Sequence, residues 1–168
     1  MKKTVLYIGI LLLIFSSSAW AQTNQETTII LIRHAEKVDN SRDPELNDKG
    51  KERALALLDL LQNTQIDAIY STNYIRTKDT VQPLADHTSL DIDLYDPRSQ
   101  DFIRKIYRDH IGETVVVSGH SNTTPAALNV ITGSKKYPNM DHDEYSSLFI
   151  ASISKWGSAR IIKLKYGE

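Results

Sequence analysis

Residues 27–37 read TTIILIRHAEK, a short apolar run that ends in the basic pair Arg33 and His34. The run is too short for a stable helix, and its β-branched side chains favour a buried strand. Residues 114–122 read TVVVSGHSN and repeat this arrangement, with His120 just beyond a second strand. Each of these two strands therefore ends close to a histidine.

The rest of the chain alternates between helical and strand patterns. After an Asn47 N-cap, residues 48–62 place aliphatic side chains at the spacing of an amphipathic helix. Near the C-terminus, residues 145–152 and 159–165 predict an antiparallel hairpin. The other predicted elements are strands at 67–70 and 90–94 and helices at 73–86, from Ser99 to His110, and from an N-cap at Thr124 to Thr132. Strands that alternate with helices predict an α/β three-layer sandwich, with a mainly parallel central sheet flanked by helices.

The first 21 residues differ in character from the rest of the chain. Lys2 and Lys3 precede an apolar run at 5–15, and Ala19 and Ala21 form the small-residue pattern found before a signal-peptide cleavage site. The apolar run is shorter than a bilayer-spanning helix requires. We therefore expect residues 1–21 to be a signal peptide and residues 22–168 to be one domain, exported to a periplasm or secreted, without stable membrane insertion after cleavage.

Composition limits the chemistry that this domain can use. The chain has no cysteine, which excludes disulfides, thiolate catalysis and cysteine-ligated metals. Without residues 1–21, it carries 18 basic and 21 acidic residues, a net charge of −3. We therefore expect no nucleic-acid partner, and any site for an anion has to be local. Nothing in the sequence indicates a particular oligomeric state.

Basic side chains follow three of the predicted strands. These are Arg33 with His34, Arg76 in the first turn of a helix, and His120. Because the carboxyl ends of parallel strands meet at one edge of a sheet, we expect these side chains to share a pocket. Two guanidinium groups would present forked donors to phosphate oxygens, and a neutral imidazole is a competent nucleophile toward phosphorus. The nearby arginines favour an unprotonated His34, His120 can donate to a phosphate oxygen, and neither a metal nor another cofactor is needed.

These segments resemble the motifs of the histidine phosphatase superfamily, also called phosphoglycerate mutase-like. The similar stretches run in the family's order: Leu31–Lys37; Leu46–Gly50 with Arg53 and Ala54; Ile69–Thr72 with Arg76 and Thr80; and Val115–Ser121. The resemblance implies that His34 becomes phosphorylated and that Arg33, Arg76 and His120 bind the phosphoryl group. It also implies a phosphate contact for Asn40, although Ala35, Glu36 and Lys37 depart from the commoner continuation of the motif.

The resemblance leaves the general acid open between two carboxylates. Many family members carry an acid shortly after the third strand, where Asp96 lies in the turn Tyr95–Arg98 and is the preferred candidate. Glu36 is the alternative, and it is also a candidate substrate-binding residue. The family's other branch has an acid directly after the second histidine, and Ser121 at that position argues against such an arrangement.

A short, exported member of this family fits a phosphomonoesterase better than a glycolytic mutase. We expect a small phosphorylated substrate, for example a cell-envelope sugar phosphate such as a lipopolysaccharide core heptose phosphate. Two alternatives are a phosphohistidine protein phosphatase and a non-catalytic module that binds a phosphorylated ligand. Residues 95–101 and 133–145 are the expected specificity segments.

Other groups of polar residues have simpler interpretations. We expect His87, His110 and His142 to be surface or helix-end residues. Residues 141–144 read DHDE, and we expect a solvated loop there and no metal site.

Overall fold

The computed structural model describes residues 26–99 and 101–167, so the expected signal peptide lies outside the described residues. Six strands occur, namely β1 (Thr27–Arg33), β2 (Ala68–Ser71), β3 (Ile92–Leu94), β4 (Thr114–Gly119), β5 (Ser147–Lys155) and β6 (Ser158–Lys165). Four helices accompany them, namely α1 (Asp48–Leu61), α2 (Ile75–Thr88), α3 (Phe102–Asp109) and α4 (Thr123–Thr132). Within the described ranges, no helix combines the length and apolar character needed to cross a membrane.

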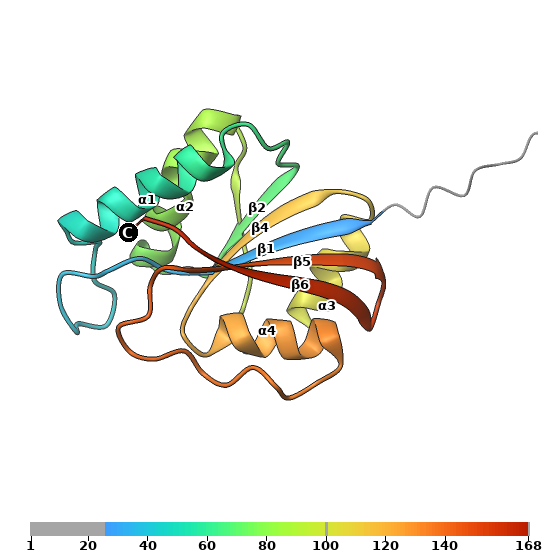
Figure 1. The fold of residues 1–168 in the computed structure, drawn as a ribbon. Helices are drawn as coiled ribbons and strands as arrows, with labels where there is room; N and C mark the ends of the chain where they lie inside the picture. The colour runs from blue at the N-terminus through green and yellow to red at the C-terminus, as the bar shows by residue number, and fades with distance from the viewer. Residues whose placement is uncertain (1–25, 100, 168) are drawn as a thin grey trace, which may run out of the picture.

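The strands form a single sheet in the order β3-β2-β4-β1-β5-β6 (Figure 1). The first four strands of this order pair in parallel. Strand β5 runs antiparallel to β1, and β6 completes an antiparallel C-terminal hairpin with β5. The predicted α/β fold, with a mainly parallel sheet and a C-terminal hairpin, is therefore confirmed.

Helices cover both faces of the sheet and bury β1 on both sides. Ile30 and Ile32 of β1 lie in a hydrophobic cluster with residues of α1 and α2. Ile29 and Leu31 lie in a second cluster with residues of α3 and α4. All four side chains are at most 2% exposed. A strand buried on both faces explains the nearly continuous apolar run in the sequence.

Two helix starts differ from the predicted ones because side chains are used elsewhere. Helix α4 has Asn122 as its N-cap residue, whereas Thr124 was the predicted cap. The buried Thr124 hydroxyl instead donates to the carbonyl of Ile32, 3.0 Å away, and so ties α4 to β1. Helix α3 follows Asp101, while the predicted cap Ser99 lies in a turn closed onto the carbonyl of Asp96.

The strand register brings the ends of β1 and β4 together. Arg33 is paired with Gly119, and the backbone N–H of His34 donates to the Gly119 carbonyl at 2.8 Å. His34 and His120 each follow one member of this pair. On the other side of β4, Ser71 of β2 is level with Ser118, so the chain enters α2 beside the same two histidines.

Candidate active site

A cavity of about 480 Å³ lies at the carboxyl ends of β1, β2 and β4. It brings together four of the side chains that the sequence singled out: Arg33, His34, Arg76 and His120. Its other lining residues are Lys37, Ser41, Pro44, Tyr74, Pro97, Arg98, Ser121, Asn122, Thr123 and His142. No carboxylate of the described residues lines this cavity, so its charge is predominantly positive.

His34 is held with one particular ring nitrogen available for reaction. Its side chain is buried, and Nδ1 lies 2.8 Å from the carbonyl oxygen of Ala35. Because a carbonyl only accepts, Nδ1 carries the proton and Nε2 keeps its lone pair in the neutral ring. Burial lowers the pKa of His34 to about 3, with Arg33, His120 and Arg76 acting in the same direction. His34 is therefore a neutral imidazole with an unprotonated Nε2 near neutral pH.

His120 lies next to His34, with 5.4 Å between the ring centroids and the rings edge to face. Its Nε2 is 3.1 Å from the hydroxyl oxygen of Thr72. Burial lowers the pKa of His120 to about 4, with further contributions from Arg76 and Arg33. Two neutral imidazoles therefore face each other in the absence of an anion.

Arg76 offers a buried donor to the cavity. Its guanidinium lies over the ring of Tyr74 at 4.5 Å, and NH1 is 3.6 Å from the carboxylate of Asp43. NH1 is buried and has no hydrogen-bond partner among the described residues. NH1 therefore has an ion pair with Asp43 but no hydrogen bond among the described residues, and the guanidinium charge beside the cavity suits an anionic ligand.

Arg33 uses its forked donors differently from the sequence-based expectation. NH1 donates to the carbonyls of Asp141 and Glu144 at 2.9 and 3.0 Å, and NH2 donates to the carbonyl of His142 at 2.9 Å. The guanidinium also lies 4.0 Å from the ring centroid of Tyr145. Only Nε is buried without a partner among the described residues. Arg33 therefore fastens the 141–145 segment to the site with three of its five N–H groups, and its positive charge remains beside the cavity.

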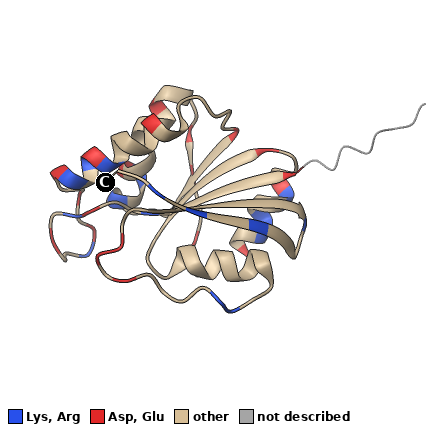
Figure 2. Cartoon of the chain, in the orientation of Figure 1, with Lys and Arg blue, Asp and Glu red and all other residues tan. Residues whose placement is uncertain are grey.

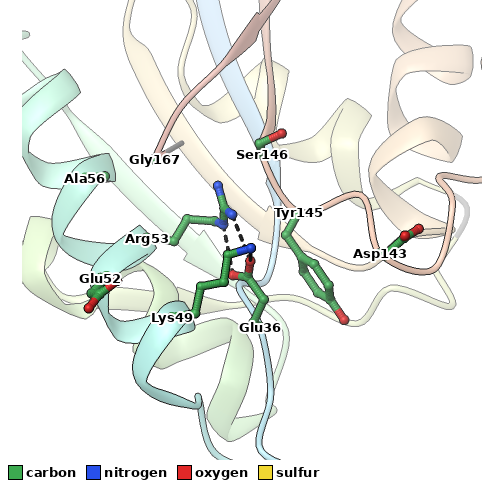
Figure 3. A pocket seen from close by; sticks show the side chains of 9 residues that line it. All are labelled: Glu36, Lys49, Glu52, Arg53, Ala56, Asp143, Tyr145, Ser146 and Gly167. Carbon is green, nitrogen blue, oxygen red and sulfur yellow. Dashed lines mark hydrogen bonds and ion pairs between the residues drawn. The ribbon is translucent and has the colours of Figure 1, made fainter.

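The structure places Glu36 outside the His34 cavity. Both carboxylate oxygens accept from Arg53, at 2.8 and 2.9 Å, and Lys49 lies 3.6 Å from one of them. Burial would raise the pKa of Glu36, but hydrogen bonds from Arg53 outweigh it and hold the pKa below its usual range. This cluster lines a separate cavity of about 620 Å³ between α1 and the segment around Tyr145. Figure 3 shows its lining side chains, with Glu36, Lys49 and Arg53 facing one another. Acidic and basic residues lie close together along this part of α1 (Figure 2).

Asp96 and Asn40 also lie outside the residues that line the His34 cavity. The carboxylate of Asp96 accepts from Nε and NH2 of Arg98 at 3.0 and 3.1 Å and borders an adjoining cavity of about 710 Å³. The side-chain oxygen of Asn40 accepts from the ammonium group of Lys37. Arg98 and Lys37 do line the His34 cavity. Asp96 and Asn40 therefore bind the side chains of two basic residues that line the cavity, Arg98 and Lys37.

Several lining or supporting residues had no individual role in the sequence-based interpretation, although Arg98 and His142 lie in the expected specificity segments 95–101 and 133–145. Tyr74, Arg98 and His142 line the cavity, and the Thr72 hydroxyl lies 3.1 Å from Nε2 of His120. Thr72 follows the second strand directly, which was a usable signal, whereas His142 is brought near by contacts of Arg33 with a segment more than 100 residues away. Within the described part of the chain, no group of three or more metal-binding side chains is suitably placed for a metal ion.

Comparisons with known proteins bear on this arrangement. The family model of the histidine phosphatase superfamily (branch 1) matches residues 29–97, a range that includes His34 and Arg76 and ends before His120. A mycobacterial glucosyl-3-phosphoglycerate phosphatase has a similar fold, with a TM-score of 0.68, 15% identity, and coverage of 84% of this chain and 99% of that chain. YhfR of Bacillus stearothermophilus has a TM-score of 0.66, 16% identity, and coverage of 80% and 95%. A proposed phosphohistidine phosphatase SixA from Agrobacterium tumefaciens has a TM-score of 0.63, 23% identity, and coverage of 82% and 97%. No curated protein matches the chain.

Proposed function

Because this chain belongs to the histidine phosphatase superfamily, we propose that it hydrolyses phosphomonoesters through a phosphohistidine intermediate on His34. The observation that carries the proposal is the state of His34, whose Nδ1 proton is held by the Ala35 carbonyl. This bond leaves the Nε2 lone pair for attack on phosphorus. The low pKa of about 3 keeps that lone pair available in neutral and mildly acidic solution.

The remaining polar groups of the cavity suit a transferring phosphoryl group. Arg33 and Arg76 both line the cavity, so their guanidinium charges favour a bound anion there. Asn122 and Thr123 also line the cavity at the start of α4, so the partial positive charge of a helix N-terminus lies beside it. These groups stabilise the negative charge that develops on the phosphoryl oxygens, without requiring a metal ion.

We further propose a small polar leaving group, such as the sugar of a cell-envelope sugar phosphate. Tyr74, Pro97 and Arg98 line both the His34 cavity and the adjoining cavity that Asp96 borders. A phosphate bound at His34 can therefore extend its ester group over these residues. In this proposal the mature protein is exported, after cleavage behind Ala21, and meets its substrate outside the cytoplasm.

One observation favours a second candidate, a phosphohistidine protein phosphatase. No carboxylate of the described residues lines the cavity, and departure of an imidazole needs less help from an acid than departure of an alkoxide. The same observation suits a non-catalytic module that binds a phosphorylated ligand. Comparing phosphohistidine, sugar phosphates and simple alkyl phosphates as substrates separates these possibilities.

The test is turnover of p-nitrophenyl phosphate by the chain starting at Gln22, with and without EDTA. We expect turnover that survives EDTA and is abolished in His34→Ala. His87→Ala is the matched control, because His87 is exposed on α2 and should leave activity unchanged. Phosphate binding without turnover at any pH would instead establish the binding module.

A further inference from the structure

We infer that His120 delivers the proton to the leaving oxygen, and that Thr72 and Thr77 determine which of its nitrogens does so. This inference rests on the proposed function, because it concerns the leaving group of the same phosphoryl transfer. It addresses a gap in the site, since Asp96 and Glu36 are engaged with Arg98 and Arg53 outside the His34 cavity.

The tautomer of His120 follows from a chain of hydroxyl groups. The Thr77 hydroxyl lies 2.9 Å from the carbonyl oxygens of Thr72 and Tyr74, which can only accept, so its one proton is donated there. Its oxygen then accepts the Thr72 hydroxyl proton at 2.9 Å. With that proton in use, the Thr72 oxygen accepts from Nε2–H of His120 at 3.1 Å. Thr72 and Thr77 are fully buried, so water does not compete in this chain.

Nδ1 of His120 is consequently the nitrogen that acts in the cavity. No hydrogen bond of the described residues involves Nδ1, and it is not among the fully enclosed atoms that lack a partner. It is therefore open to the cavity that His120 lines. In the neutral ring Nδ1 can only accept, so His120 has to gain a proton there before it can donate to a bound phosphate ester.

Bound substrate favours the protonation of Nδ1 in His120. Burial lowers the pKa of His120, and Arg76 and Arg33 oppose a further positive charge. A phosphate group bound between these arginines and His120 offsets their charge and favours the imidazolium form. The proton that Nδ1 takes up comes from the phosphate monoanion or from solvent. His120 is then charged only when substrate is present.

The proposed phosphoryl transfer to water takes two steps. Nε2 of His34 forms a bond to phosphorus while the bond from phosphorus to the ester oxygen breaks, and the Nδ1 proton of His120 passes to that oxygen. Water then attacks the phosphohistidine, its proton passes to Nδ1 of His120, and the bond between phosphorus and Nε2 breaks to release phosphate. His34 returns to its starting state, and His120 is ready for the next cycle.

The groups around His120 leave few other proton carriers. Arginine and lysine stay charged near neutral pH, and His34 is used in attack. The titratable and charged residues of the cavity are Arg33 and His34 from the end of β1, Lys37 from the loop after it, Tyr74 and Arg76 from the start of α2, Arg98 from the turn after β3, and His142. Of these, the exposed His142 is the competitor that the experiment has to separate from His120.

The experiment compares two substrates whose leaving groups differ in basicity, p-nitrophenyl phosphate and glycerol phosphate, using Thr72→Val and Thr72→Ser. Departure of glycerol needs a proton, whereas nitrophenolate leaves readily without one. We expect Thr72→Val to lower kcat/KM for glycerol phosphate by about tenfold to hundredfold and for the nitrophenyl ester by less than about threefold. In Thr72→Val, the basic limb of the pH profile of kcat/KM for glycerol phosphate should also move to lower pH, because the His120 imidazolium loses the acceptor of its Nε2 proton. Thr72→Ser should restore both properties.

The matched control is Thr88→Val, which removes a hydroxyl that bonds only within α2 and should behave as wild type. An equal loss of kcat/KM on both esters in Thr72→Val would overturn the inference. It would also be overturned if His142→Gln lost glycerol phosphate turnover selectively while Thr72→Val was unaffected. Absence of nitrophenyl phosphate turnover in the wild type would overturn the proposed function as well, so the two failures are distinguishable.

A second measurement uses the unmodified chain and does not depend on how the variants fold. NMR of protein with isotopically labelled histidine ring nitrogens reports the protonation of each nitrogen. The signals of His120 are assigned by their absence from His120→Gln. We expect His120 to carry its proton on Nε2 when free and to gain one on Nδ1 when inorganic phosphate is added. A proton on Nδ1 in the free protein, or no change with saturating phosphate, would overturn the inference.

Discussion

The bound pair of Glu36 and Arg53 allows a quantitative test of what Glu36 does. Both oxygens of Glu36 accept from the Arg53 guanidinium, and the two residues are 8% and 5% exposed. Glu36→Gln leaves one acceptor for two donors and an uncompensated buried cation. Removing one partner of a buried ion pair costs about 3–5 kcal/mol, and the open cavity beside this pair favours the lower end, about 3 kcal/mol. Urea denaturation measures the expected loss in the free energy of unfolding.

The same variant should keep the leaving-group dependence of the wild type, because Glu36 is a structural partner in this account. Asp109→Asn is the control, since it removes one partner of an exposed ion pair with Lys105 and should cause no measurable change in stability. A loss below about 1 kcal/mol in Glu36→Gln would refute the reasoning about the buried pair. Preferential loss of alkyl phosphate turnover would show that Glu36 acts as the acid.

Four further outcomes are expected. The pKa of His34 falls from about 6.5 in the unfolded chain to about 3 in the folded one. The neutral His34 ring therefore contributes its full stabilisation above the unfolded pKa, and this stabilisation is lost as pH falls toward 3. In His34→Gln, the free energy of unfolding should fall less than in the wild type between about pH 6.5 and pH 3, as measured by denaturation at a series of pH values. Gly50→Ala brings a Cβ within 2.1 Å of the Glu36 carbonyl oxygen, and it should reduce stability by about 1–3 kcal/mol in thermal denaturation. Asp96→Asn should reduce kcat/KM by less than about tenfold, because it only releases Arg98, whereas a direct proton donor contributes more. Mass spectrometry of the exported protein should find Gln22 as the first residue, and an intact Met1 would contradict the signal-peptide prediction.

The sequence predicts this fold well where local pattern and packing agree. The apolar runs of β1 and β4 are buried on both sheet faces, so their composition and their position in the sheet indicate the same structure. The register of Arg33 with Gly119 then follows from parallel pairing, and it brings His34 beside His120. This is why two histidines that are 86 positions apart were predictable neighbours.

Contacts between distant segments explain what the sequence did not predict. The guanidinium of Arg33 donates to the backbone carbonyls of Asp141, His142 and Glu144. Every residue has such a carbonyl, so a sequence does not show which ones an arginine will bind. The Thr124 hydroxyl bonds to Ile32 across the sheet, so a good cap residue is not the cap. The position of Asp96 in a turn made it a plausible acid, but only the folded chain shows its carboxylate against Arg98.

The central claim is that His34 accepts the phosphoryl group, and trapping that intermediate tests it most directly. The chain starting at Gln22 is mixed with p-nitrophenyl phosphate, quenched rapidly in base, digested and examined by mass spectrometry. We predict one phosphoryl group on His34 that is lost in acid, kept in base and absent from His34→Ala. An acid-stable adduct, or a phosphoryl group on another residue, would contradict the account.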